Sequence, residues 1–259
     1  MQTSVNSTGP ILVIDDDEVM REVLSLLLGA AGHNVLTVDS GEAALTLLAA
    51  LPQGQRPAVV LTDLTMPGLS QSALAMRLRL ACPAPGLLVA MSGSAPAADE
   101  AAAFDAFLLK PFTVADLEAA VERARAHSAG TRTPVPAGAR RGKKAPVEAH
   151  NEVLNEAVYA RLSAAMGASL TQFHTMLVED TLARIERMRA AIANHDEETF
   201  IREAHTIKGS CGMLGATELQ VLAERGETGG LAGSSLINDF GPALERLRRM
   251  LDKQARQTG

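Results

Sequence analysis

Short apolar runs alternate with amphipathic helical patterns over residues 10–127. Strands that alternate with helices form βαβ units and a parallel sheet, so this segment predicts a doubly wound α/β domain with a five-stranded parallel sheet. Ligands of such domains bind at the carboxyl ends of the strands. The expected strands are Ile11–Ile14, Val35–Val38, Val59–Thr62, Leu87–Met91 and Ala106–Leu109, and the expected helices cover residues 17–30, 41–50, 70–80, 96–104 and 113–127.

The pattern changes after residue 127. Residues 128–150 contain several prolines and basic side chains and have no apolar periodicity, which predicts a flexible basic linker. Residues 151–259 show helical periodicity only, and short connections between long helices favour an antiparallel all-α bundle. Its expected helices cover residues 152–165, 169–194, 196–214, 216–226 and 237–255, and the glycine-rich segment 226–233 is expected to be a loop between two helices.

Charge and hydropathy argue against several functional classes. The formal net charge of −6 argues against a non-specific nucleic-acid binder. The first ten residues lack the apolar centre of a signal peptide, and no apolar run approaches the ~20 residues that span a bilayer. We therefore expect a cytoplasmic protein. The basic linker can contact an acidic partner or nucleic acid, although a solvated linker is the simpler interpretation.

Polar side chains follow four of the predicted strands, at the point where each strand ends. Asp15 and Asp16 follow the first run, Asp63 the third, Ser92 the fourth and Lys110 the fifth. Because the carboxyl ends of parallel strands meet at one edge of the sheet, we expect these side chains to converge. Three carboxylates repel one another unless a cation joins them, and Mg²⁺ prefers oxygen ligands. An aspartate can act as a nucleophile and form an acyl phosphate, with lysine and Mg²⁺ stabilising the transferring phosphoryl group.

These residues resemble the receiver domain of two-component response regulators, which has a flavodoxin-like fold. The matching motifs are Ile14-Asp15-Asp16, Asp63 with Met66-Pro67-Gly68, Ser92, and Lys110-Pro111-Phe112. The resemblance implies that Asp63 is the phosphoacceptor and that Asp16 and Asp63 bind Mg²⁺ directly. It implies that Asp15 assists through a water and that the backbone carbonyl of Thr65 is a further ligand.

The same resemblance makes two further predictions for this domain. Ser92 and Phe107 correspond to the switch pair of the family, whose rotamers follow phosphorylation. The peptide bond between Lys110 and Pro111 is expected to be cis.

A histidine motif lies within the predicted helix 196–214. An apolar stripe recurs there at three- and four-residue steps, which predicts that His205 projects toward solvent with Lys208 one turn along. Gly209 and Gly212 lie on the histidine's side of the helix, where each glycine costs roughly 1 kcal/mol relative to alanine, so we predict close approach of a docking partner. The stripe consists of Phe200, Ala204, Ile207, Cys211 and Leu214.

The run His205-Thr206-Ile207-Lys208-Gly209-Ser210 resembles the His-x-x-Lys-Gly-Ser signature of the histidine-phosphotransfer (HPt) domain. The resemblance covers about residues 155–255. It implies a four-helix bundle with exposed His205 as phosphoacceptor and Lys208 steadying the phosphoryl charge. Domains of this family lack an ATP site, and none is visible here. Gly226 stands where the family normally has leucine, so the helix around it is expected to end early.

Together the two resemblances predict a phosphorelay protein that is not an ATP-dependent enzyme and depends on a separate sensor or hybrid histidine kinase. The leading route runs from the kinase to Asp63, then to His205, then to a downstream response regulator. The sequence leaves open the reverse order, in which Asp63 is a phosphate sink. It also leaves open a regulatory module that docks on a sensor kinase and modulates it. No DNA-binding domain and no membrane insertion are expected.

Overall fold

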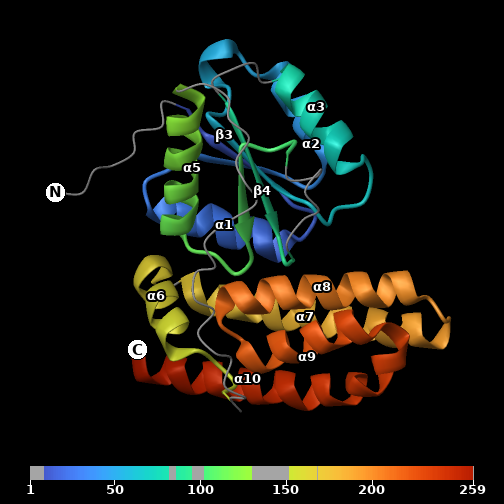
Figure 1. The fold of residues 1–259 in the computed structure, drawn as a ribbon. Coiled ribbons are helices and arrows are strands. Elements are labelled where there is room, and N and C mark those ends of the chain that lie inside the picture. The colour runs from blue at the N-terminus through green and yellow to red at the C-terminus, as the bar shows by residue number, and fades with distance from the viewer. Residues whose placement is uncertain (1–8, 82–85, 95–101, 130–151, 168, 259) are drawn as a thin grey trace. The chain divides into compact units, whose positions relative to one another are not determined.

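The computed structural model describes residues 9–81, 86–94, 102–129, 152–167 and 169–258 of the 259-residue chain (Figure 1). These residues form two compact units, one on each side of segment 130–151. The predicted linker therefore lies almost entirely outside the described residues, and its first two positions, 128 and 129, belong to a helix of the first unit.

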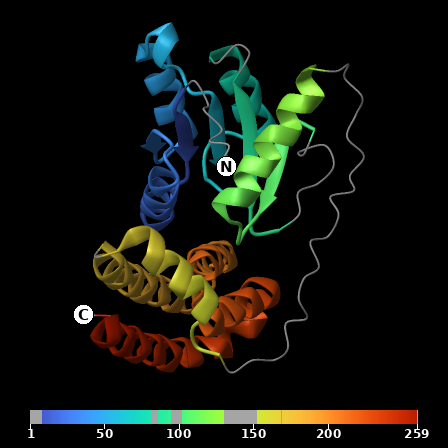
Figure 2. The ribbon, with the colours of Figure 1, turned by 90° about the vertical axis from the view of Figure 1, so that its left-hand side faces the viewer.

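The first unit is built on a five-stranded parallel sheet in the order β2-β1-β3-β4-β5, which confirms the predicted doubly wound α/β fold. The central strands β1 and β3 are entirely buried, which explains why apolar residues predominate in both. Helices cover both faces of the sheet (Figures 1 and 2). The elements are β1 Ile11–Ile14, α1 Glu18–Ala30, β2 Val35–Val38, α2 Gly41–Ala50, a 3₁₀ turn Gln53–Gln55, β3 Val59–Asp63, α3 Gln71–Ala81, β4 Leu87–Ser92, β5 Ala106–Leu109 and α5 Val114–Ala129.

The strand ends are aligned by the register of the sheet. Ile14, the last residue of β1, pairs with Thr62 of β3, and Asp63 pairs with Met91 of β4. The residues that follow β1, β3 and β4 therefore emerge at one edge. Of the predicted helix 96–104, residues 96–101 lie outside the described residues, and residues 102–105 form turns and bends rather than helix.

The second unit is helical, as predicted. The helices α7 to α10 make most of the contacts between its elements, and the shorter α6 contacts α7 and α8. All five residues of the predicted stripe on α8 are buried, so the apolar face was identified correctly. The elements are α6 Glu156–Met166, α7 Ser169–Ala193, α8 Glu197–Leu214, α9 Thr217–Gly229, a 3₁₀ segment Gly230–Leu236 and α10 Ile237–Thr258.

The glycine-rich segment departs from the sequence prediction. Residues 226–229 continue α9, and a 3₁₀ segment follows directly, so the predictions of a loop over 226–233 and of an early helix end are wrong. Gly226 is buried, and a Cβ placed on it would lie 3.6 Å from the Cβ of Ala204 on α8. Packing of α9 against α8 thus outweighs the weak helix propensity of glycine.

Among the described residues, no helix combines the length and the apolar character needed to cross a membrane.

Candidate functional site

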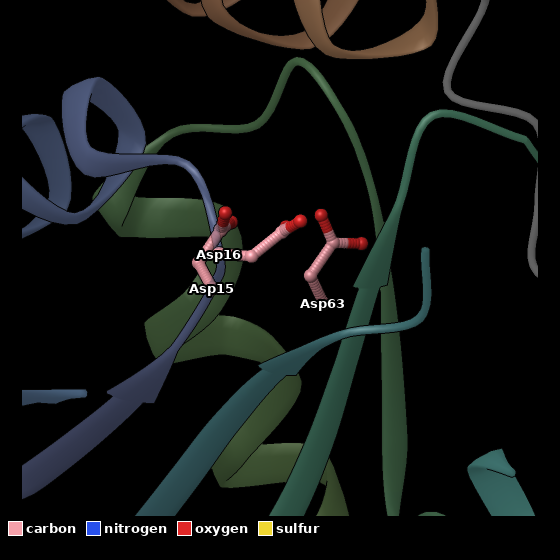
Figure 3. Close-up of side chains that lie close together, drawn as sticks. All are labelled: Asp15, Asp16 and Asp63. Carbon is pink, nitrogen blue, oxygen red and sulfur yellow. The ribbon is translucent and has the colours of Figure 1, made fainter. Parts of the chain in front are cut away.

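Three carboxylates meet at the carboxyl edge of the sheet. Asp15 and Asp16 follow β1 and Asp63 ends β3, and one oxygen from each lies within 4.8 Å of the others. Figure 3 shows the three side chains turned toward one another. Asp15 and Asp63 are buried and Asp16 is exposed. The convergence expected from the strand ends is therefore present, and its oxygen atoms are of the type that hard divalent cations prefer.

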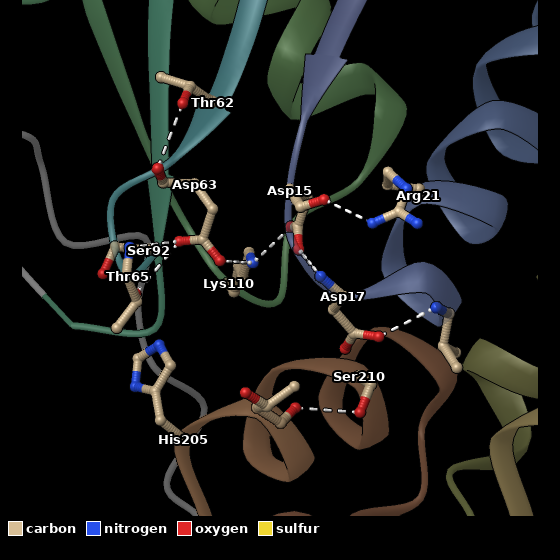
Figure 4. A network of polar contacts seen from close by, with 12 residues as sticks. Asp15, Asp17, Arg21, Thr62, Asp63, Thr65, Ser92, Lys110, His205 and Ser210 are labelled. Carbon is tan, nitrogen blue, oxygen red and sulfur yellow. Dashed lines mark hydrogen bonds and ion pairs between the residues drawn. The ribbon is translucent and has the colours of Figure 1, made fainter. Parts of the chain in front are cut away.

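Lys110 joins two of these carboxylates. Its Nζ lies 3.1 Å from Asp15 Oδ2 and 2.8 Å from Asp63 Oδ2, and the contacts run in one row in Figure 4. The lysine follows β5, and its bond to Pro111 is cis, as the resemblance implies. Sequence reasoning placed Lys110 at this edge, and the structure shows it between the two acids.

The electrostatics of the cluster reflect burial and crowding. Burial, together with the nearby charge of Asp63, raises the pKa of Asp15 to about 7, although Lys110 acts in the opposite direction. Burial alone would lower the pKa of Lys110, but the charges of Asp15 and Asp63 outweigh burial and raise it. Burial is thus the main reason that Asp15 resists ionisation, and Lys110 is the cation that favours its charged form.

Further hydrogen bonds orient the two buried carboxylates. The backbone N–H and the hydroxyl of Thr65 donate to Asp63 Oδ1 over 3.0 and 3.2 Å. The backbone N–H of Asp17 donates to Asp15 Oδ1, and Arg21 Nη1 donates to the Asp15 carbonyl over 2.8 Å. Both acid-bearing loops are therefore held in place (Figure 4). Arg21 was missed at the sequence level, because a bond to a backbone carbonyl leaves no signal in the pattern.

Ser92 ends β4 at the same edge of the sheet, and its Oγ accepts a hydrogen bond from the N–H of Ser94 over 3.3 Å. Phe107, on β5, is partly buried and packs against the apolar core. The structure thus locates Ser92 at the carboxyl edge of the sheet and Phe107 on β5. The change of their rotamers on phosphorylation stays a prediction.

The histidine site lies between α8 and α9. His205 Nδ1 is 2.6 Å from Glu227 Oε1, and Lys208 Nζ is 2.5 Å from Glu227 Oε2. Burial would raise the pKa of Glu227, but hydrogen bonds and charge from His205 and Lys208 prevail and lower it to about 2. The prediction that His205 projects toward solvent is therefore wrong, because the residue is only 8% exposed and its Nδ1 faces Glu227 of α9. Glu227 was missed because it lies on a different helix, 22 positions along the chain.

One of the two glycines predicted as docking positions, Gly212, lies against a side chain of the same domain. A Cβ on Gly212 would lie 3.1 Å from the amide of Gln220 on α9. Close packing of α8 and α9 is one reason for a small residue there. Docking by Gly209 and Gly212 stays a prediction.

Comparison with known families matches both units. Residues 11–122 match the response regulator receiver domain, and residues 172–257 match the Hpt domain. The chain therefore carries a receiver domain followed by an Hpt domain, as the two motifs imply.

Individual relatives cover one or both of these domains. The transcriptional regulatory protein FixJ of Bradyrhizobium diazoefficiens is 38% identical over 123 residues, 46% of this chain and 58% of FixJ. The virulence sensor protein BvgS of Bordetella pertussis is 30% identical over 265 residues, 95% of this chain but 20% of BvgS. A response regulator, TrrA from Thermotoga maritima, solved in complex with Mg²⁺-BeF, is 24% identical with a TM-score of 0.40, covering 45% of this chain and 98% of TrrA. The chain thus spans only part of the curated relatives it matches.

Proposed function

We propose that this protein is a phosphorelay component that receives a phosphoryl group on Asp63 and carries one on His205. The observation that supports the proposal is that one chain holds two clusters at the predicted phosphoacceptor motifs: Asp63 and Asp15 bridged by Lys110, and His205 and Lys208 bridged by Glu227. The alignment to BvgS, a protein named as a sensor, runs through both domains, which supports a role beside a sensor kinase.

At the receiver site, an oxygen of Asp63 would attack the phosphorus of a phosphohistidine on the partner. The new O–P bond forms as the N–P bond breaks, and the electron pair returns to the partner's imidazole. Lys110, 2.8 Å from Asp63 Oδ2, would stabilise the charge on the transferring group. Ser92 and Phe107 would then report the modification to the surface, as the resemblance implies.

A magnesium ion fits the donor set of this site. Three carboxylate oxygens, one each from Asp15, Asp16 and Asp63, lie within 4.8 Å of one another, and carboxylate oxygens are ligands that Mg²⁺ prefers. Asp16 and Asp63 would hold the ion directly, with Asp15 acting through water and the Thr65 carbonyl as a further ligand. Bound there, Mg²⁺ would neutralise charge on phosphate oxygens.

At the Hpt site, His205 would be the acceptor and Lys208 would steady the bound phosphoryl group. The proposed partners are a sensor or hybrid histidine kinase and a downstream response regulator. The protein would have no ATP site of its own and would act in the cytoplasm. Following the phosphoryl label on Asp63 and on His205 over time shows which residue is labelled first. It also distinguishes a relay from a module that modulates a kinase without transferring the label.

The test uses a small phosphodonor, acetyl phosphate, on the full chain. We expect acid-stable, hydroxylamine-sensitive label in the presence of Mg²⁺, lost on chelation with EDTA and lost in Asp63→Asn. Asp39→Asn, an exposed acid outside the cluster, is the matched control and should label normally. Undiminished label in Asp63→Asn would exclude Asp63 as the acceptor.

A further inference from the structure

Helix α6 packs on the Hpt domain as a separate element. It lies at one end of the second unit, where it contacts α7 and α8 (Figure 1). The residues that match the Hpt domain begin at 172, so α6, which ends at Met166, lies wholly outside them. Four buried apolar side chains anchor α6 and the segment before it: Leu154, Tyr159, Leu162 and Met166. α6 is therefore an addition to the matched domain with a small interface of its own.

The interface beneath α6 contains a buried imidazole. His174 of α7 is buried, and its ring stacks on the ring of Tyr159 with centroids 5.5 Å apart and an interplanar angle of 19°. Among the residues that the structure describes, its Nε2 has no hydrogen-bond partner. A buried polar atom without a partner costs free energy, and water removes this cost when α6 moves away from the ring. His174 therefore favours the release of α6.

The surroundings of His174 offer no compensation for a positive charge on the ring. Tyr159 is the titratable group that faces it from α6, and every charged side chain of α6 and α10 is exposed. Asp180 on α7 and Glu203 and Lys208 on α8 are each paired with another charged group. Burial alone lowers the pKa of His174 from 6.5 to about 4. The attraction of an imidazolium to an aromatic face acts the other way, but it is weaker than the desolvation of a buried cation.

We propose that α6 is a separable cover of the Hpt domain, which docks on α7 through the stack of Tyr159 on His174 and is released when His174 takes up a proton. This inference does not depend on the role of either proposed phosphoacceptor. α6 also joins segment 130–151 to the bundle, so its release adds residues 152–167 to the connection between the two units. In the proposed relay, a longer connection lowers the effective concentration of each acceptor for the other.

Proton linkage determines the sign and the size of the effect. The released state binds the proton with the ordinary pKa of 6.5, and the docked state binds it with a pKa of about 4. The ratio of released to docked α6 therefore rises as the pH falls through this range, and it becomes constant below pH 4. Between pH 7.5 and pH 5 the two pKa values give a rise of about 25-fold.

Hydrogen exchange on the full chain tests the proposal. Peptides from α6 and α8 are compared by mass spectrometry at pH 7.5 and pH 5, and each rate is corrected for intrinsic exchange. We expect α6 to open on its own, with protection about tenfold or more below that of α8, and its opening should rise about 25-fold at pH 5. His174→Phe should reduce this rise to less than about threefold, whereas His127→Gln, at an exposed histidine of α5, should keep it.

A second pair of variants tests the stack itself at pH 7.5. Tyr159→Ala removes the ring that covers His174, so protection of α6 should fall by about tenfold or more, while α8 keeps the protection of wild type. Arg161→Ala, at an exposed position of the same helix, is the matched control and should leave both helices within about twofold of wild type.

Two results would overturn the inference: equal protection of α6 and α8 at both pH values, or a rise in His174→Phe as large as that in wild type. Melting curves at pH 7.5 show whether each variant is folded. If His174→Phe unfolds, the wild-type chain decides the question, because an α6 opening that rises less than about threefold at pH 5 contradicts release by protonation.

Discussion

The stability of the Hpt domain should depend on the protonation of one buried histidine that has no part in phosphotransfer. His174 on α7 is 8% exposed, and its ring stacks on Tyr159 of α6 with centroids 5.5 Å apart. Within the described part of the chain its Nε2 has no hydrogen-bond partner. Burial lowers the pKa of His174 from 6.5 to about 4, so the folded domain holds this ring neutral.

The sign and size of the effect follow from proton linkage. Below pH 6.5 the unfolded chain binds a proton at His174 that the folded domain takes up only near pH 4, so stability falls as the pH falls through this range. With one pKa unit equal to about 1.4 kcal/mol, the loss between pH 7.5 and pH 5 amounts to about 2 kcal/mol. The other shifted groups among the described residues of this domain contribute little between pH 5 and pH 7.5: Glu227 has a pKa of about 2, the pKa of Asp196 is lowered and that of Arg246 is raised.

Urea unfolding of the Hpt domain can be followed by tyrosine fluorescence. The chain has one tyrosine and no tryptophan, so tyrosine fluorescence during urea unfolding reports on the Hpt domain through Tyr159. His174→Phe keeps a flat ring against Tyr159 but cannot be protonated, and it should lose about 2 kcal/mol less than wild type between pH 7.5 and pH 5. His127→Gln, at an exposed histidine of α5, should behave as wild type. Parallel pH profiles for wild type and His174→Phe would refute the reasoning.

Two further predictions concern packing and transfer. Gly215 has φ +75°, and a Cβ there would lie 2.9 Å from Val158 Cβ, so Gly215→Ala should destabilise the Hpt domain by roughly 1–3 kcal/mol. The control Gly229→Ala, at a position with open space for a Cβ, should not destabilise it. Equal stability of the two variants in urea unfolding would contradict this prediction. If the remaining residues of the predicted linker, 130–150, are a flexible tether, their reach of roughly 25 Å gives an effective concentration near millimolar, so exchange between Asp63 and His205 in wild type should not slow on dilution. A rate proportional to protein concentration would mean that the two acceptors serve separate partners.

Much of the receiver domain was predictable because its central strands are buried on both faces. Such strands consist mostly of apolar residues, and their ends were located to within one residue. The convergence of Asp15, Asp63 and Lys110 followed from parallel topology alone, since strand ends of one sheet meet at one edge. The stripe on α8 was equally clear, because every residue on it is apolar.

The errors occurred where contacts between helices decide the structure. Gly226 was expected to end a helix, because local propensity says nothing about the buried side chains of α8 against which it packs. Glu227 was not singled out in the sequence, since its contacts with His205 and Lys208 depend on how α9 packs against α8. The solvated environment expected for His205 failed for the same reason. Periodicity identifies the face of a helix but not the neighbour that covers it.

The claim that a phosphoryl group passes between Asp63 and His205 is tested most directly by mixing two full-length variants, each of which keeps one of these two acceptors. A His205→Gln chain labelled on Asp63 by acetyl phosphate is freed of donor and mixed with affinity-tagged Asp63→Asn, whose remaining acceptor is His205. We expect acid-labile, base-stable label on the tagged chain, absent when that chain also carries His205→Gln. With the chains mixed at about the millimolar concentration that the tether would provide, label that leaves Asp63 only as inorganic phosphate, with none on the tagged chain, would contradict the relay.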